Sequence, residues 1–171
     1  MNNCMMIMAV AVVVCGCVAN QPIPKGIDSL TDEDIGMMVV RSMDKIYRGV
    51  NDGRIAKKSP NARIVAKIQP FEMSNLANDA RAKEVVSELE RRLCTEMAAG
   101  GWFFFPDASS GTASGAMLQP DCILKGKLSC IITENGAFSD SEFRLQLSIV
   151  DVSTGIVVWE GKITLVKRTQ S

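Results

Sequence analysis

Apolar and polar positions recur with two different periods along this chain, and the longer period predicts two helices. In both segments the apolar residues return every three to four positions, as on one face of an α-helix. The first segment begins behind Thr31, which has an acidic residue three positions later as in a capping box, and it runs to about Arg48. The second covers residues 79–97, with its charged residues on the opposite face. We therefore expect two amphipathic helices.

Alternation with a period of two predicts strands, most clearly toward the C-terminus. Residues 142–152 are apolar at every second position, and the pattern returns after a Ser-Thr-Gly turn, which indicates a β-hairpin. The segment 133–141, which contains Asn135-Gly136, is expected to be a loop that connects this hairpin to the preceding strand. The predicted strands are 63–68, 102–105, 122–132, 142–152 and 156–166.

The order of these elements predicts one α/β domain over residues 31–171. Strands separated by a helix favour parallel pairing, whereas the last three strands must form an antiparallel meander. We expect a two-layer sandwich, in which a mixed sheet of about five strands carries both helices on one face. The glycine- and serine-rich segment 107–121 is expected to be a loop.

The N-terminus carries the pattern of a bacterial lipoprotein leader. Residues 5–14 are continuously apolar and have the length of a signal-peptide core. Behind them Val14-Cys15-Gly16-Cys17 forms a lipobox, in which the thiol accepts a diacylglycerol and two small residues precede it. This predicts a signal peptide over residues 1–16 and a lipidated Cys17. No basic residue precedes the apolar run, so a buried apolar segment or an uncleaved membrane anchor remain alternatives.

The segment after the predicted cleavage site has the composition of a tether. Residues 17–30 contain two prolines and a glycine and show no period, so we expect a lipidated cysteine followed by a short linker. Val18, rather than an aspartate, after the cysteine favours the outer membrane under the usual sorting rule. The predicted location is the cell envelope, lipid-anchored to the outer membrane, with the domain facing the periplasm.

Composition argues against several classes of function. The chain has 19 basic and 19 acidic residues and a sequence pI of about 6.3, so no basic excess favours nucleic acid. It contains no histidine, the commonest general base and zinc ligand. We therefore expect no enzyme, metal, cofactor or small-molecule substrate. Cys94, Cys122 and Cys130, outside the leader, are expected to be buried or half-buried free thiols.

Three segments of the C-terminal half resemble the closing hairpin of the LpoB family. They are Leu124-Lys125-Gly126, Leu145-Gln146-Leu147-Ser148-Ile149-Val150-Asp151 and Thr154-Gly155-Ile156-Val157-Val158-Trp159-Glu160-Gly161. The lipobox and the order of elements from residue 31 to about 168 fit the same family. Members of that family are outer-membrane lipoproteins that activate bifunctional, class A penicillin-binding proteins.

This resemblance implies an outer-membrane lipoprotein that binds and activates such a penicillin-binding protein and so regulates peptidoglycan synthesis. Similar hairpins occur in other envelope domains, so the alternative is a structural or assembly lipoprotein of an export or appendage apparatus. The implied partner is a class A penicillin-binding protein, and the membrane is reached through the lipid. Cys17 is the predicted lipidation site, and the partner-binding residues are left unassigned.

Several residues have both a structural and a functional interpretation. Trp159 lies among inward-facing positions and is expected in the core, with an interface anchor as the alternative. Asp151 and Glu160 flank the hairpin turn and are expected to be solvated rather than a catalytic pair. The loops 133–141 and 107–119 are candidate partner surfaces. A basic cluster, either a solvated loop or an anion-binding surface, comprises Arg54, Lys57, Lys58 and Arg63, with Asn51.

Overall fold

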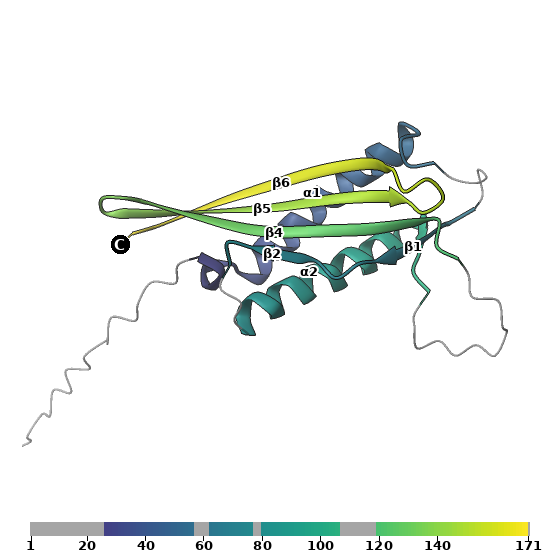
Figure 1. Cartoon of the computed structure of the whole chain (residues 1–171). Coiled ribbons are helices and arrows are strands. Elements are labelled where there is room, and N and C mark those ends of the chain that lie inside the picture. The colour runs from purple at the N-terminus through teal and green to yellow at the C-terminus, as the bar shows by residue number, and fades with distance from the viewer. Residues whose placement is uncertain (1–25, 57–61, 77–79, 107–118, 171) are drawn as a thin grey trace, which may run out of the picture.

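The structure, a computed structural model, describes residues 26–56, 62–76, 80–106 and 119–170 (Figure 1). The predicted helices and strands are present, together with two short elements that the sequence did not predict. In chain order the elements are η1 (Gly26–Ser29), α1 (Asp32–Asn51), β1 (Ile64–Ile68), β2 (Glu72–Ser74), α2 (Ala80–Ala99), β3 (Phe103–Phe104), β4 (Cys122–Asn135), β5 (Phe138–Asp151) and β6 (Val157–Gln170).

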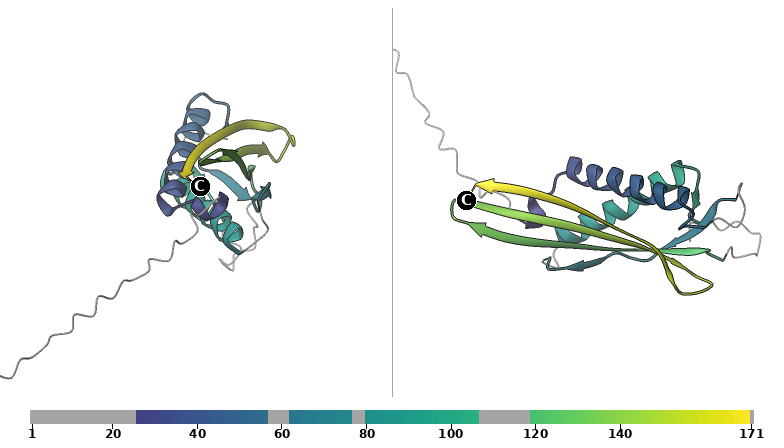
Figure 2. Two further views of the ribbon diagram at one scale, coloured as in Figure 1. Left: turned by 90° about the vertical axis from the view of Figure 1, so that its left-hand side faces the viewer. Right: turned by 90° about the horizontal axis from the view of Figure 1, so that it is seen from above.

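The strands form one mixed sheet in the order β3-β1-β4-β5-β6, and both helices lie on the same face of it (Figure 2). β1 pairs in parallel with β3 and β4, and the β4-β5-β6 meander is antiparallel. This confirms the predicted α/β fold. The unpredicted β2 also pairs in parallel with β4, further along that strand than β1 does. Pro70 breaks the apolar pattern between them, which is why the sequence predicted only one strand here.

The prediction of a loop over residues 133–141 is wrong. β4 continues to Asn135 and β5 begins at Phe138, so only Gly136 and Ala137 form the turn, with Gly136 at φ 62°. The alternation was hidden because Ser139 and Ser141 occupy positions on the helix-facing side of the sheet, where an apolar residue was expected. Both serines are fully buried. The meander is therefore longer than the sequence indicated.

Residues 26–30, which the sequence analysis assigned to the tether, pack against the domain instead. Ile27 and Leu30 are buried, and the Gly26 amide donates a hydrogen bond to Ser141 Oγ at 3.2 Å. A single 3₁₀ turn is too short to show a period, so composition alone favoured a linker. Residues 1–25, which include the predicted leader and Cys17, lie outside the described residues.

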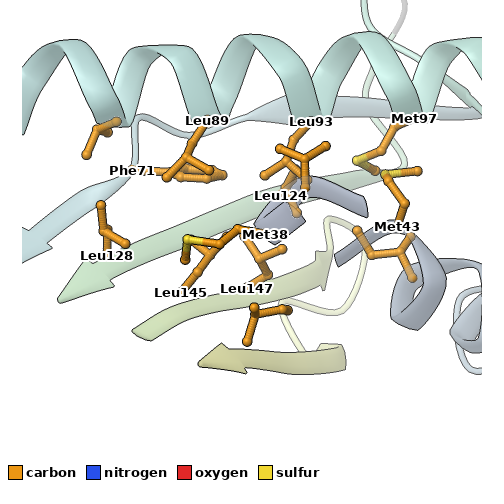
Figure 3. Close-up of a cluster of buried hydrophobic side chains, with 14 of the residues drawn as sticks. Met38, Met43, Phe71, Leu89, Leu93, Met97, Leu124, Leu128, Leu145 and Leu147 are labelled. Carbon is orange, nitrogen blue, oxygen red and sulfur yellow. The ribbon is translucent and has the colours of Figure 1, made fainter. Parts of the chain in front are cut away.

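The core lies between the helix-facing side of the sheet and the apolar stripes of the two helices. Leu128, Leu145 and Ile163 stand side by side on β4, β5 and β6, and all three are buried. Figure 3 shows the side chains of this layer meeting those of the helices. The buried residues labelled there are Met38, Met43, Phe71, Leu89, Leu93, Met97, Leu124, Leu128, Leu145 and Leu147.

A half-buried ion pair between Asp34 and Lys167 joins the start of α1 to β6. Thr31 and Asp34 form the capping box that the sequence predicted, with the Thr31 amide donating to Asp34 Oδ2 at 2.9 Å. Lys167 Nζ donates to the same carboxylate oxygen at 2.6 Å and to the Ser29 carbonyl at 2.7 Å. Burial raises the pKa of Asp34, but the bonds from Lys167 and Thr31 together outweigh it and hold the pKa below its usual value.

This pair predicts a loss of stability in acid. A carboxyl with a lowered pKa in the folded state stabilises the fold above its unfolded pKa of about 3.9, and the contribution disappears as the pH falls through the folded value. At pH 7, Asp34→Asn will lower the free energy of unfolding by about 1–3 kcal/mol. The wild type and the variant will converge below about pH 4 in urea denaturation. A constant difference between them down to pH 2 would contradict this assignment.

Two glycines in α1 predict opposite effects of the same substitution. A β-carbon at Gly36 would lie 3.7 Å from Arg92, an ordinary contact, so Gly36→Ala will stabilise the helix by about 0.5–1 kcal/mol. A β-carbon at Gly49 would lie 2.5 Å from Trp159 Cδ1. Overpacking costs about 1–3 kcal/mol, so Gly49→Ala will destabilise the protein despite the gain in helix propensity. Thermal unfolding of both variants measures the difference, and two shifts of the same sign would contradict it.

Candidate functional site

One face of the β4-β5-β6 meander points away from the helices (Figure 2). The side chains on this face are polar along most of its length. Its side chains stand in rows across the strands because the three strands pair in antiparallel register, which is interrupted only by a bulge of β6 opposite Ile149 and Val150. One row is Lys127, Gln146 and Lys162, and the next row is Lys125, Ser148 and Glu160. A sheet face without covering helices leaves these polar groups in contact with solvent, where a partner can reach them.

The middle of this face is hollowed, because the sheet is curled. The hollow has a volume of about 440 Å³. Three ammonium groups and two carboxylates line it, which gives it a small positive balance. Within the described ranges, neither Lys125 nor Lys127 forms an ion pair. The charged lining residues are Glu72, Lys125, Lys127, Glu160 and Lys162, joined by Gln146 and Ser148.

Nearer the β4-β5 turn, the same face carries two bidentate arginine–carboxylate pairs. Arg144 binds Glu142 at 2.7 Å, and Arg168 binds Asp140 at 2.7 Å. The guanidinium hydrogen bonds hold the pKa of Glu142 and of Asp140 below the usual range, so both carboxylates are charged at neutral pH. The Arg168 guanidinium also lies 5.9 Å from the centre of the Phe138 ring. These groups offer a partner fixed hydrogen-bonding geometry rather than reactive chemistry.

A second hollow, of about 410 Å³, lies at the end of the sheet where β1 and β4 begin. Asp121 Oδ2 accepts a hydrogen bond from the Val65 amide at 2.8 Å and so joins the two strands. Burial raises the pKa of the Cys122 thiol in this hollow to about 12, so it remains protonated and unreactive. Burial also raises the pKa of Cys130. As predicted, Cys122 and Cys130 are buried and Cys94 is half-buried, and among the described residues none of the three is in a disulfide.

The candidate residues from the sequence do not come together as one site. Trp159 is buried in the core, as expected. Asp151 is bonded within the hairpin turn and Glu160 is exposed at the polar hollow, so they form no catalytic pair. Arg54 of the basic cluster pairs with Asp52, whereas Lys57 and Lys58 lie outside the described residues. The predicted loop 107–119 also lies outside them, except for Gln119.

The sequence analysis did not identify the lysines of the polar hollow. These lysines occupy the polar positions of the alternating pattern, which predicts that they face outward. They come from separate strands, and only the register of those strands brings them together. In the described part of the chain, no three side chains of the metal-binding types gather into a possible metal site. None of the helices in that part is long and apolar enough to span a membrane.

Solved structures that match this chain come from several bacteria. The LpoB C-terminal domain from Escherichia coli matches with a TM-score of 0.43 and 18% identity, over 78% of this chain and 98% of that one. The hypothetical protein CT253 from Chlamydia trachomatis matches with a TM-score of 0.43 and 14% identity, over 62% and 73%. Lipoprotein GNA1162 from Neisseria meningitidis matches with a TM-score of 0.42 and 10% identity, over 63% of this chain and 85% of that one. A search of the curated proteins finds no match.

The family comparison is more specific. Residues 105–165 match the family model described as peptidoglycan-synthase activator LpoB. A domain of this family implies an activator of a peptidoglycan synthase, and such activators are not enzymes, which confirms that prediction. The family also implies a synthase as partner and suggests the cell envelope as location. The resemblance that the closing hairpin indicated is thereby confirmed: residues 105–165 of this chain match the LpoB family.

Proposed function

We propose that this chain is an outer-membrane lipoprotein, anchored through Cys17, whose periplasmic domain binds and activates a bifunctional, class A penicillin-binding protein. The observation that carries the proposal is the family match over residues 105–165, which covers β4, β5 and most of β6. The lipobox at residues 14–17 supports the anchor. The polar outer face of the meander fits a protein that acts by binding.

Activation requires only that the domain bind the active conformation of the synthase more tightly than the inactive one. A tenfold difference between the two affinities, about 1.4 kcal/mol, shifts the equilibrium between the conformations tenfold. No group on the domain has to take part in the chemistry. The fixed arginine–carboxylate pairs and the rigid meander suit this role, since a preorganised surface loses little entropy on binding.

The lipid anchor limits the distance from the membrane at which the domain can contact the synthase. Only eight residues, 18–25, separate Cys17 from Gly26, a span of roughly 30 Å when fully extended. The 14 residues of β4 add about 45 Å to the reach. A synthase partner must therefore come within about 75 Å of the membrane surface that holds the lipid.

Binding of the full-length protein, purified in detergent, to each class A penicillin-binding protein of its own organism tests the proposal. We expect saturable binding to at least one of them, and none to a monofunctional transpeptidase at the same concentration. Absence of binding to every class A enzyme would overturn the proposal. Formation of closed rings by the purified lipidated protein, without such binding, would instead support the assembly role.

A further inference from the structure

The end of the meander that carries the β4-β5 turn projects beyond the helices (Figure 1). β4 and β5 pair without interruption up to this turn, so the projecting end is a continuous part of the sheet. The last row across its outer face is Asn135, Phe138 and Gln170, and Phe138 is 44% exposed. We call residues 135–138 the hairpin tip. The tip therefore presents an aromatic ring that the core of the domain does not cover.

The hairpin tip contains no charged residue, and the charges directly behind it balance one another. Two acidic residues, Glu134 and Asp140, face two basic ones, Lys167 and Arg168. The Arg168 guanidinium donates to both oxygens of Asp140, at 2.7 and 2.9 Å, and lies 5.9 Å from the centre of the Phe138 ring. The tip is thus an uncharged end with an exposed aromatic ring, backed by polar groups without net charge.

The chain enters the domain at this same end. The Gly26 amide donates a hydrogen bond to Ser141 Oγ, and Ser141 lies three positions from Phe138 on β5, a distance of about 10 Å. Residues 18–25 separate Gly26 from Cys17, a span of roughly 30 Å when fully extended. The hairpin tip therefore lies within reach of a membrane that holds a lipid attached to Cys17.

The opposite turn of the meander cannot take this place. It also exposes an aliphatic side chain, Ile156, at 63%. However, Asp151 at the start of that turn is ten positions from Ser141 on β5, about 33 Å. Residues 18–25 do not span that distance even when fully extended. Of the two ends of the meander, the lipid anchor therefore brings the hairpin tip to the membrane.

The small size of the hairpin tip favours a lipid surface over a protein as its partner. A stable protein interface buries about 800 Å² on each side and involves about 20–30 residues, whereas the tip has four. A lipid surface requires no complementary shape. The acyl chains of the anchor supply the affinity, so contact of the tip with the membrane is an intramolecular step that sets the orientation of the domain.

We propose that the hairpin tip inserts into the interface of the membrane that holds the lipid anchor, with Phe138 as the inserted side chain. This rests on the proposed function, because it requires the lipid at Cys17. Phe138 enters the boundary between headgroups and acyl chains, and the remaining N–H groups of Arg168 donate to lipid phosphates. Glu134 and the Asp140–Arg168 pair stop deeper insertion, because burial of charged groups is costly. The meander then stands on the membrane with its opposite turn directed away from it.

Fluorescence quenching by brominated lipids tests the insertion. The lipidated protein is placed in vesicles of phosphatidylethanolamine and phosphatidylglycerol that carry bromine on their acyl chains. Phe138→Trp adds one indole to Trp102 and Trp159, and Ile156→Trp is the matched control at the opposite turn. We expect a blue shift and quenching of the added emission for Phe138→Trp, and neither for Ile156→Trp. Equal quenching of both variants, or no quenching of the indole added at position 138, would overturn the proposal.

Photo-crosslinking in the living cell identifies the partner of the tip. A photoreactive phenylalanine analogue at position 138 of the full-length protein should crosslink to phospholipid, and the same analogue at position 156 should not. Crosslinks from position 138 only to a protein or to a second copy of this chain would overturn the proposal. If the wild type stimulates a class A synthase but position 138 contacts no lipid, the insertion is wrong while the function stands. If the wild type carries no lipid and leaves the membrane fraction, the lipid anchor of the proposed function fails as well.

Discussion

Replacement of Trp159 by alanine is expected to lower the free energy of unfolding by about 3–5 kcal/mol, a large part of the stability of a domain this size. The indole is 4% exposed. It fills the space beside two glycines, since a β-carbon added at Gly49 or at Gly161 would lie 2.5 Å from its ring. Truncation leaves a cavity between α1 and β6 that neither glycine can fill. Urea denaturation followed by circular dichroism measures the loss.

The matched control for this prediction is Val166→Ala on the same strand. Val166 is 59% exposed on the outer face, so its truncation should change stability by no more than about 0.5 kcal/mol. A Trp159→Ala protein as stable as this control, but impaired in binding the synthase, would show that the tryptophan is an interface anchor. Loss of stability together with loss of binding is the result that a core tryptophan predicts.

Substitution of Cys17 by alanine is expected to abolish lipidation completely. The reaction needs the thiol of the lipobox cysteine, so the variant will incorporate no labelled palmitate and will leave the membrane fraction. Two or more acyl chains give stable membrane binding, whereas no lipid-derived attachment remains without them. Metabolic labelling and membrane fractionation of the full-length chain measure both effects.

Cys15→Ala is the control for this prediction, because it removes the neighbouring cysteine but keeps a small residue two positions before Cys17. We expect this variant to be lipidated normally. Palmitate incorporation into Cys17→Ala would contradict the assignment of Cys17. Retention of that variant in the membrane fraction without label would favour an uncleaved membrane anchor.

The regular elements were predictable because their patterns are strong. The capping box at Thr31 and Asp34 and the apolar stripe of α2 identify the helices to within about three residues at each end. The ends of the long strands were not predictable, because Ser139 and Ser141 are buried on the core face although their side chains are polar. Ser141 is used to bind the Gly26 amide, a contact between residues 115 positions apart. No local pattern contains that information.

The candidate contact surface was largely hidden for the same reason. Lys125 and Lys162 come from β4 and β6, and they line one hollow only because β5 holds both strands in register. The sequence marked the Ser-Thr-Gly turn as a hairpin connection, but not the bonds from Asp151 that fix it. Alternation predicts which side chains face outward, and it leaves open which outward residues become neighbours.

The most direct test of the central claim follows glycan-chain polymerisation by the organism's own class A penicillin-binding proteins while the full-length protein is added. An activator predicts a rate that rises with its concentration and saturates at a fixed stoichiometry, with at least one of these enzymes. The Val40→Ser variant should give the same curve as the wild type. A rate that stays unchanged for every class A enzyme, at concentrations that saturate any binding, would contradict the account.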